Sequence, residues 1–230
     1  THEGTIELDA AIMNGRTLAC GAIAGVRTIR NPITLARRVM EATPHVFLAG
    51  EGAEAFAREA GVEIVDPSYF RTEERWDELQ RELRRESSNA VALPTPEMGT
   101  VGAVAIDRRG DLAAATSTGG RTNKRFGRVG DVSVLGAGTY ADNRTCAVSA
   151  TGKGEEMIRH FAAANVSARI EHGGRTLQRA VREVVRDVLE PGDGGMIAVG
   201  PGGVAVLEFN TEGMFRGAAD SAGRFEIGIR

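Results

Sequence analysis

The first half of the chain arranges its apolar and polar positions in short segments separated by turn signals. Residues 5–13 and 17–26 have β-type patterning on either side of Asn14-Gly15, which predicts a type I′ hairpin. Asn31-Pro32 has the form of a helix N-cap followed by proline, and Pro44 ends that helix near Thr43. The pattern then predicts a short buried strand over 45–49, a helix over 51–60 that stops at Gly61, and a helix that opens at Asp66-Pro67. This last helix carries Trp76, Leu79 and Leu83 on one stripe, and its mixed Arg and Glu outer face is interpreted as solvated surface.

The second half begins after a segment, residues 87–98, that has two prolines and no periodicity and is predicted to be a linker. Strands are expected over 101–106, 112–118, 135–140 and 146–150, helices over 154–172 and 176–189, and a last hairpin over 195–200 and 203–208. Few strand–helix–strand crossovers appear. The pattern therefore predicts an α+β fold of largely antiparallel sheets with helices packed outside.

Composition and charge narrow the functional class. The 230 residues are 42% hydrophobic and 26% charged, as in a soluble globular domain, and the net charge of −3 argues against a nucleic-acid binder. No apolar run is long enough for a membrane span, so no membrane partner is expected. The two cysteines and four histidines have no zinc or disulfide spacing, and no secretory signal is visible, which predicts no metal site, reduced thiols and a cytoplasmic location.

Threonines and glycines gather at the predicted strand ends, in the four segments 99–102, 116–120, 127–131 and 150–154. Counting outward from the turn at Arg108-Arg109 pairs Ile106 with Asp111 and Thr100 with Ser117. Because such a count can slip by one residue, the prediction is that Thr100 and the hydroxyls of residues 116–118 are neighbours. The fourth segment is a strand, a glycine turn and a helix, which directs backbone N–H groups toward an anion or oxyanion. Arg128 and Asp131 have the charges to hold the carboxylate and ammonium of an amino acid. Alternatively, the threonines are only good strand residues, the charged pair is internal, and the glycines form plain turns.

Several motifs together carry a family resemblance. Gly-Thr-Val-Gly from Gly99, Thr-Ser-Thr-Gly-Gly from Thr116, Gly-Arg-Val-Gly-Asp from Gly127 and Ala-Thr-Gly-x-Gly-Glu from Ala150 resemble the plant-type L-asparaginase/isoaspartyl peptidase family. The resemblance implies an N-terminal-nucleophile hydrolase with a four-layer αββα sandwich. It also implies one domain over 1–230 that cleaves itself between Gly99 and Thr100, giving an α subunit of residues 1–99 and a β subunit of residues 100–230.

The resemblance also implies the site roles and the partners. Thr100 would be the nucleophile, with its freed amine as the base, and Thr118 would tune its hydroxyl; such an amine has a pKa of about 7.7–8. The Thr151 hydroxyl and the Gly152 N–H would form the oxyanion hole, Arg128 and Asp131 would bind the substrate's α-carboxylate and α-amine, and Gly154 would complete the binding segment. The expected substrates are L-asparagine and β-aspartyl dipeptides, no catalytic cofactor is expected, and the expected assembly is a homodimer of cleaved αβ units.

Related branches and one departure leave alternatives open. Glycosylasparaginases typically carry Asp and Asn where Gly99 and Gly119 stand here, and threonine aspartases lack the acidic residue at Asp131. Family precursors usually have, before the equivalent of Thr5, a His-Gly-Gly-Ala-Gly strand and an Asn-Ala-Gly loop that binds a structural sodium ion. This sequence contains neither. The alternatives are thus a glycosylasparaginase-like amidohydrolase and a non-catalytic or maturation-defective truncated homologue.

Overall fold

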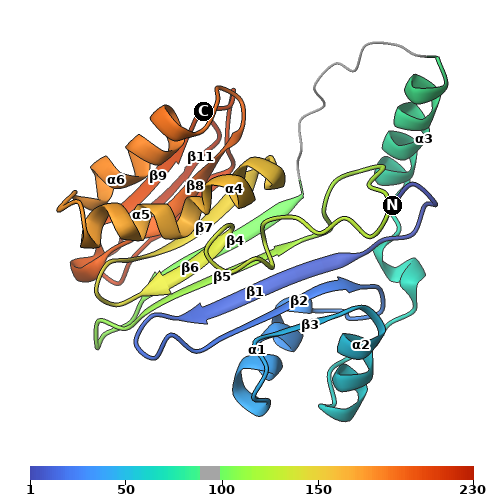
Figure 1. The fold of residues 1–230 in the computed structure, drawn as a ribbon, viewed down its shortest axis with the longest axis horizontal. Helices are drawn as coiled ribbons and strands as arrows, with labels where there is room; N and C mark the ends of the chain where they lie inside the picture. Colours follow the sequence, from blue (N-terminus) through green and yellow to red (C-terminus); the bar gives the residue numbers. More distant parts are fainter. Residues whose placement is uncertain (89–98) are drawn as a thin grey trace.

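The fold is a stack of four layers, two helical layers outside and two β-sheets inside (Figure 1). It is taken from a computed structural model, which describes residues 1–88 and 99–230, so that nearly all of the predicted linker over 87–98 lies outside the described residues. The predicted α+β class and αββα architecture are confirmed.

The first sheet has the strand order β3-β2-β1-β5-β4. Its strands are β1 (Leu8–Asn14), β2 (Cys20–Val26), β3 (Phe47–Ala49), β4 (Thr100–Ile106) and β5 (Leu112–Thr118). Helices α1 (Pro32–Ala42) and α2 (Gly50–Glu59) cover its outer face, where Ile23, Leu35 and Val39 are fully buried. Only the pair β2–β3 in this sheet is parallel, because α1 connects these two strands as a crossover.

The second sheet has the order β6-β7-β8-β9 and is antiparallel throughout. Its strands are β6 (Thr139–Asp142), β7 (Cys146–Gly152), β8 (Gly194–Val199) and β9 (Ala205–Phe209). Helices α4 (Gly154–His160), α5 (Ala162–Glu171) and α6 (Leu177–Glu183) pack against it over a core that includes Val148, Met157, Val166, Val181 and Met196. The predicted helix over 154–172 is divided at Phe161, whose φ of 47° interrupts it, and that over 176–189 ends in a π-helical turn (Val184–Val188).

Small side chains hold the two sheets together. Ala114, Ala141 and Ala147 are buried between them together with Met13 and Leu112. Toward the C-terminal end of β5, the side chains between the sheets carry hydroxyl groups. Thr116 Oγ1 lies 2.7 Å from both Ser149 Oγ and Thr139 Oγ1. Such short side chains let the sheets approach closely, and the mutual hydrogen bonds satisfy the buried hydroxyls.

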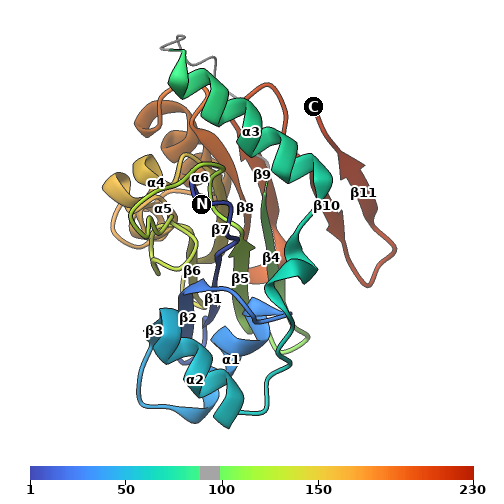
Figure 2. The same cartoon turned by 90° about the vertical axis from the view of Figure 1, so that its right-hand side faces the viewer.

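Two elements lie outside these layers (Figure 2). Helix α3 (Glu73–Ser87) follows a 3-10 turn (Pro67–Phe70), so the helix predicted from Asp66-Pro67 is two elements. Asp66 caps the turn by accepting the N–H of Ser68, and Thr72 caps α3 by accepting the N–H of Arg75. A C-terminal hairpin of β10 (Arg216–Ala219) and β11 (Phe225–Gly228), which the sequence analysis did not predict, projects from the body.

Two further local predictions are wrong. The β1–β2 hairpin forms, but five residues, 15–19, connect its strands instead of a type I′ turn, because Asn14 Oδ1 accepts the N–H groups of Arg16 and Thr17 and holds a wider turn. The left-handed residue of this turn is Leu18, with φ 59°. The strand predicted as buried over 45–49 is instead β3, an edge strand whose Phe47 is 42% exposed.

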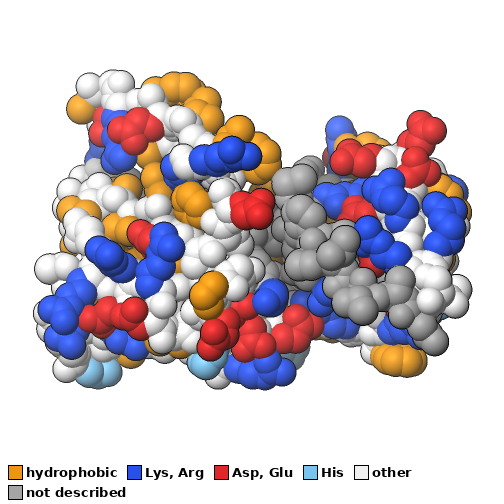
Figure 3. Space-filling view, turned by 90° about the horizontal axis from the view of Figure 1, so that it is seen from above, with side chains coloured by type: hydrophobic (Ala, Val, Ile, Leu, Met, Phe, Trp, Pro, Cys, Tyr) orange, Lys and Arg blue, Asp and Glu red, His pale blue; other side chains and the backbone are white. Residues whose placement is uncertain are grey.

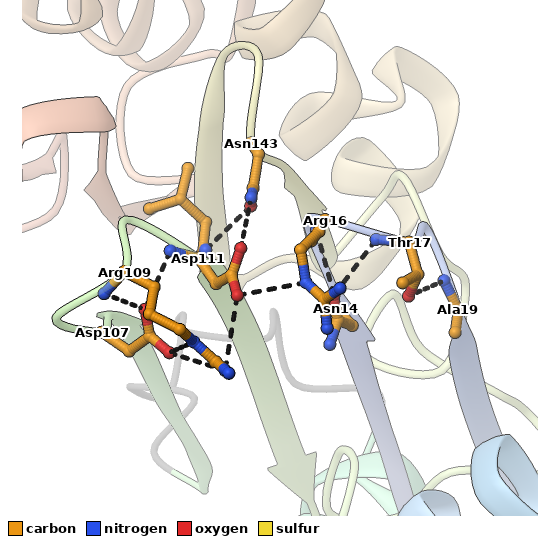
Figure 4. A network of polar contacts seen from close by, with 9 residues as sticks. Asn14, Arg16, Thr17, Ala19, Asp107, Arg109, Asp111 and Asn143 are labelled. Carbon is orange, nitrogen blue, oxygen red and sulfur yellow. Dashed lines mark hydrogen bonds and ion pairs between the residues drawn. The ribbon is translucent and has the colours of Figure 1, made fainter.

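The turns at one end of the sheets are joined by a polar network (Figure 4). Asp111 accepts a hydrogen bond from Asn143 Nδ2 at 2.9 Å and forms an ion pair with Arg16 at 3.1 Å, and Asn143 Oδ1 accepts the Leu112 N–H. Asp107 closes the β4–β5 turn by accepting the N–H groups of Arg109 and Asp111. This network joins turns of the two sheets at the end opposite to Thr100 and Thr118.

A glycine on β2 tests how closely α1 packs on the first sheet. A Cβ on Gly21 would lie 2.0 Å from the Ala36 carbonyl oxygen and 2.7 Å from the Met40 nitrogen, both backbone atoms of α1. We therefore expect Gly21→Ala to lower the free energy of unfolding by about 3 kcal/mol, as overpacking does. Gly52→Ala is the matched control, because Gly52 lies within α2 with nothing near its Cβ position, and helix propensity predicts a gain of about 0.5–1 kcal/mol. Denaturant unfolding of both variants should give opposite signs; equal effects would contradict the packing argument.

Candidate active site

The register of β4 and β5 places two threonine hydroxyls side by side. Thr100, the first residue of β4, pairs directly with Thr118, the last residue of β5. The predicted neighbourhood of these hydroxyls is confirmed, but the predicted pairing of Thr100 with Ser117 is off by one residue, since Ile106 pairs with Leu112. Directly opposed residues in an antiparallel pair point to the same face of the sheet.

Thr118 lies at the centre of a short hydrogen-bond chain. The Thr100 hydroxyl donates to Thr118 Oγ1 at 3.2 Å, and Thr118 Oγ1 also accepts the Gly120 N–H at 3.0 Å. The Thr118 hydroxyl can then donate to the carbonyl oxygen of Gly99, 3.5 Å away. The side chain that accepts the hydrogen bond of the Thr100 hydroxyl thus also faces the carbonyl that precedes Thr100.

The second sheet brings Thr151 and Gly152 to the same end of the molecule, at the end of β7. Gly152 has a φ of 138°, and a Cβ there would lie 2.0 Å from the carbonyl oxygen of Asp193, so this turn needs glycine. Gly152 lines the cleft that contains Thr100, whereas Thr151 is not among its lining residues. Of the N–H groups that the sequence analysis directs toward a ligand, that of Lys153 is already bonded to the carbonyl of Asp193 at 2.7 Å.

The loop between β5 and β6, residues 119–138, supplies the charged groups. Arg128 donates from Nε and Nη2 to the two carboxylate oxygens of Glu155 at 2.8 and 2.9 Å, and Asp131 is 5% exposed. A Cβ on Gly154 would lie 2.9 Å from both Arg128 Nη2 and Asp131 Oδ1. The lack of a side chain at Gly154 therefore leaves room for the arginine and the aspartate to approach the same point.

One cleft of about 490 Å³ unites these groups. Its walls include six residues considered in the sequence analysis (Gly99, Thr100, Thr118, Arg128, Asp131 and Gly152). The polar face of α3 also lines this cleft, with Arg75, Glu78, Glu82, Arg85 and Glu86. The face interpreted from the sequence as plain solvated surface therefore also lines the candidate site. Figure 3 shows side chains of both charges crowded over the end of the molecule where α3 lies.

Hydrogen bonds from Arg128 lower the pKa of Glu155 to about 2, although its partial burial opposes the shift. Glu155 is thus ionised at any working pH, and it keeps the Arg128 guanidinium oriented along one edge. Glu155 is the last residue of the motif that begins at Ala150, and no role for it was predicted from the sequence. The only sequence signal for it was its place directly after Gly154.

The part of the chain that the structure describes has neither a metal-binding cluster nor a membrane-spanning helix. Among residues 1–88 and 99–230, no group of three or more His, Cys, Asp or Glu side chains is arranged to hold a metal ion. Within the same ranges, no helix has both the length and the apolar character needed to cross a membrane.

Comparison with known proteins identifies relatives that are named as asparaginases and isoaspartyl peptidases. The sequence model of a family described as asparaginase matches residues 1–229. The chain is 50% identical over 223 residues to the isoaspartyl peptidase of Salmonella typhimurium, covering 94% of this chain and 71% of that relative. It is 44% identical over 254 residues to the probable isoaspartyl peptidase/L-asparaginase 2 of Arabidopsis thaliana, covering 100% and 77%, and 43% identical over 229 residues to the isoaspartyl peptidase/L-asparaginase of Mus musculus, covering 98% and 69%.

Proposed function

This chain belongs to the asparaginase family, and from that membership and the cleft we propose that it is an autoprocessed isoaspartyl peptidase and L-asparaginase. It would hydrolyse the side-chain amide of L-asparagine and the β-linked peptide bond of β-aspartyl dipeptides. The observation that carries the proposal is the common cleft, in which the Thr100 hydroxyl, its partner Thr118 and the charged side chains of Arg128 and Asp131 face one volume.

Maturation is the first proposed step and divides the single domain into residues 1–99 and 100–230. The Thr100 Oγ attacks the carbonyl carbon of Gly99, the Gly99–Thr100 amide bond breaks, and the Thr100 nitrogen takes up the proton of the hydroxyl. Water then hydrolyses the resulting ester, which leaves a carboxylate on Gly99 and a free amine on Thr100. The Thr118 hydroxyl, 3.5 Å from the Gly99 carbonyl oxygen, supports this step because it is placed to stabilise the developing negative charge.

Turnover uses the same hydroxyl with its new amine. The amine accepts the proton of Thr100 Oγ as the hydroxyl attacks the substrate's side-chain carbonyl carbon, and it then gives that proton to the leaving ammonia or amino acid. Water hydrolyses the aspartyl ester and releases L-aspartate. The Thr151 hydroxyl and Gly152 N–H are proposed as the oxyanion hole, while Arg128 binds the α-carboxylate and Asp131 the α-amine, with Gly154 leaving space between them.

Assembly, compartment and ions complete the proposal. We propose a homodimer of cleaved αβ units and a cytoplasmic location, which the two free thiols of Cys20 and Cys146 support. The proposed reaction draws its nucleophile and base from Thr100 and uses no catalytic cofactor. A structural sodium ion is part of the family resemblance, but its usual loop is not in this sequence, so no residue here is assigned to it.

Intact-mass measurement combined with an activity assay tests the function. We expect two fragments that separate at Gly99–Thr100, and release of L-aspartate from both L-asparagine and a β-aspartyl dipeptide. A protein that is cleaved but releases no aspartate from either substrate would contradict the assigned reaction. A protein that stays uncleaved and inert would instead favour the maturation-defective alternative.

A further inference from the structure

Three charged side chains are buried within or next to the loop that carries Arg128 and Asp131. Asp9 on β1 is 0% exposed, Lys124 in the loop is 6% exposed, and Glu7, just before β1, is 7% exposed. Burying charges is costly unless they are paired and hydrogen-bonded. The proposed reaction uses none of the three, so their burial calls for another explanation.

The Lys124 ammonium connects this buried cluster to the substrate-binding loop. Its Nζ lies 3.3 Å from Glu7 Oε2 and donates a hydrogen bond of 3.3 Å to the carbonyl oxygen of Arg128. Glu7 is held in turn by Arg27 at 2.6 Å. The ammonium therefore binds the main chain of the residue whose guanidinium is proposed to hold the substrate carboxylate.

Asp9 adds negative charge at the same place. Its Oδ1 accepts the Gly25 N–H at 2.8 Å, while its buried Oδ2 has no hydrogen-bond partner among the described residues. Burial raises the pKa of this carboxyl, and the hydrogen bond from the Gly25 N–H and the positive charge of Lys124 oppose the rise. Lys124 thus contacts Glu7 on the β1 side and the Arg128 backbone on the loop side, and Asp9 adds a further acidic group to the same cluster.

The loop needs such an anchor because it has no secondary structure of its own. Residues 119–138 contain no helix or strand. Phe126 is 100% exposed, so its aromatic side chain does not anchor the loop by packing into the core. Between Gly120 and Gly130, the backbone bonds that the loop makes to itself are those from Lys124 to Arg121 and from Arg128 to Arg125. Within this stretch, Lys124 supplies a buried cation, because its side chain is only 2% exposed.

We propose that Lys124 is a positioning residue for the substrate clamp formed by Arg128 and Asp131, with Glu7 fixing its ammonium. This inference rests on the proposed function, because it assumes that the clamp binds the α-carboxylate and α-amine of the substrate. Lys124 acts through the main chain at Arg128, and it leaves the chemistry at Thr100 unchanged.

The test is Lys124→Met in the cleaved enzyme. We expect KM for L-asparagine and the dissociation constant of the product L-aspartate to rise together by about tenfold or more, the range of a charge-assisted hydrogen bond, while kcat stays within about threefold of wild type. A general loss of structure would lower kcat and the active fraction instead. Unchanged KM and L-aspartate affinity, or a loss confined to kcat, would overturn the inference.

Two more variants make the test decisive. Glu7→Gln combined with Lys124→Met removes both members of the buried pair, so it avoids an uncompensated charge if the single variant does not fold, and it should show the same rise in KM. Arg144→Met is the control, because Arg144 also pairs with a buried aspartate, Asp142 at 2.7 Å, but does not line the cleft; KM and kcat should not change. L-aspartate binding by calorimetry separates the proposed hydrolase function from the proposed clamp. Wild-type protein that is inactive but binds L-aspartate would refute the function, and the effect of Lys124→Met on that binding would still test the clamp. Wild-type protein that does not bind L-aspartate would refute the clamp.

Discussion

Thr100→Ala is expected to yield one uncut polypeptide of residues 1–230 with no hydrolysis of L-asparagine or β-aspartyl dipeptides. Both losses have one cause, since the missing oxygen is the atom proposed to attack Gly99 during maturation and the substrate carbonyl during turnover. The fold should persist, because Thr100 is the first residue of an edge strand and the substitution removes a hydrogen bond to Thr118 that is long, at 3.2 Å. Intact mass and an assay for released L-aspartate measure the two losses separately.

Thr100→Ser is the matched comparison, because it keeps the hydroxyl and removes only a methyl group. We expect this variant to cleave and to retain measurable turnover, with a lower rate where the methyl group restricts the side-chain rotamer. Cleavage of the Thr100→Ala protein at the same bond would show that another group attacks Gly99. Residual turnover by an uncut Thr100→Ala protein would show that the reaction does not pass through this hydroxyl.

The sequence predicted most of the layers because their signals are local. Hydrophobic periodicity located both hairpins of the first sheet, β1–β2 and β4–β5, and helix boundaries such as Pro32 and Gly61 agree with α1 and α2 within a residue or two. What it missed depends on side chains that bond to nearby backbone. Asp107 accepts two N–H groups and makes the β4–β5 turn one residue wider on one side than the counted turn, which moved Thr100 from Ser117 to Thr118.

The candidate site was predicted only as far as its motifs reach. Thr100, Thr118, Arg128 and Asp131 stand out because each belongs to a glycine-rich segment with a family resemblance. Glu155, 27 residues after Arg128, becomes significant only through its two hydrogen bonds to the guanidinium. The polar face of α3 reads as ordinary surface in the sequence, because nothing in a mixed Arg and Glu pattern shows that a cleft lies against it.

Arg128→Met is expected to lower kcat/KM for L-asparagine by about 100-fold, mainly through KM. A guanidinium–carboxylate contact is charge-assisted and bidentate, and its removal leaves the substrate carboxylate without its partner in a partly buried cleft. The arginine side chain is 19% exposed, so water replaces it poorly. Steady-state kinetics and the dissociation constant of L-aspartate measure the effect.

Arg128→Lys separates geometry from charge, because lysine keeps the positive charge but cannot form the planar two-point contact with Glu155 or with a substrate carboxylate. We expect it to recover only part of the lost kcat/KM. If Arg128 binds the α-carboxylate, KM should also be graded among the methionine variants. It should be highest for Arg128→Met, lower for Lys124→Met, and equal to the wild-type value for Arg144→Met. The reason is that removing the binding group costs more than loosening its anchor. A KM for Arg128→Met equal to that of wild type would place the substrate carboxylate elsewhere in the cleft, and the cations of α3 would be the next groups to test.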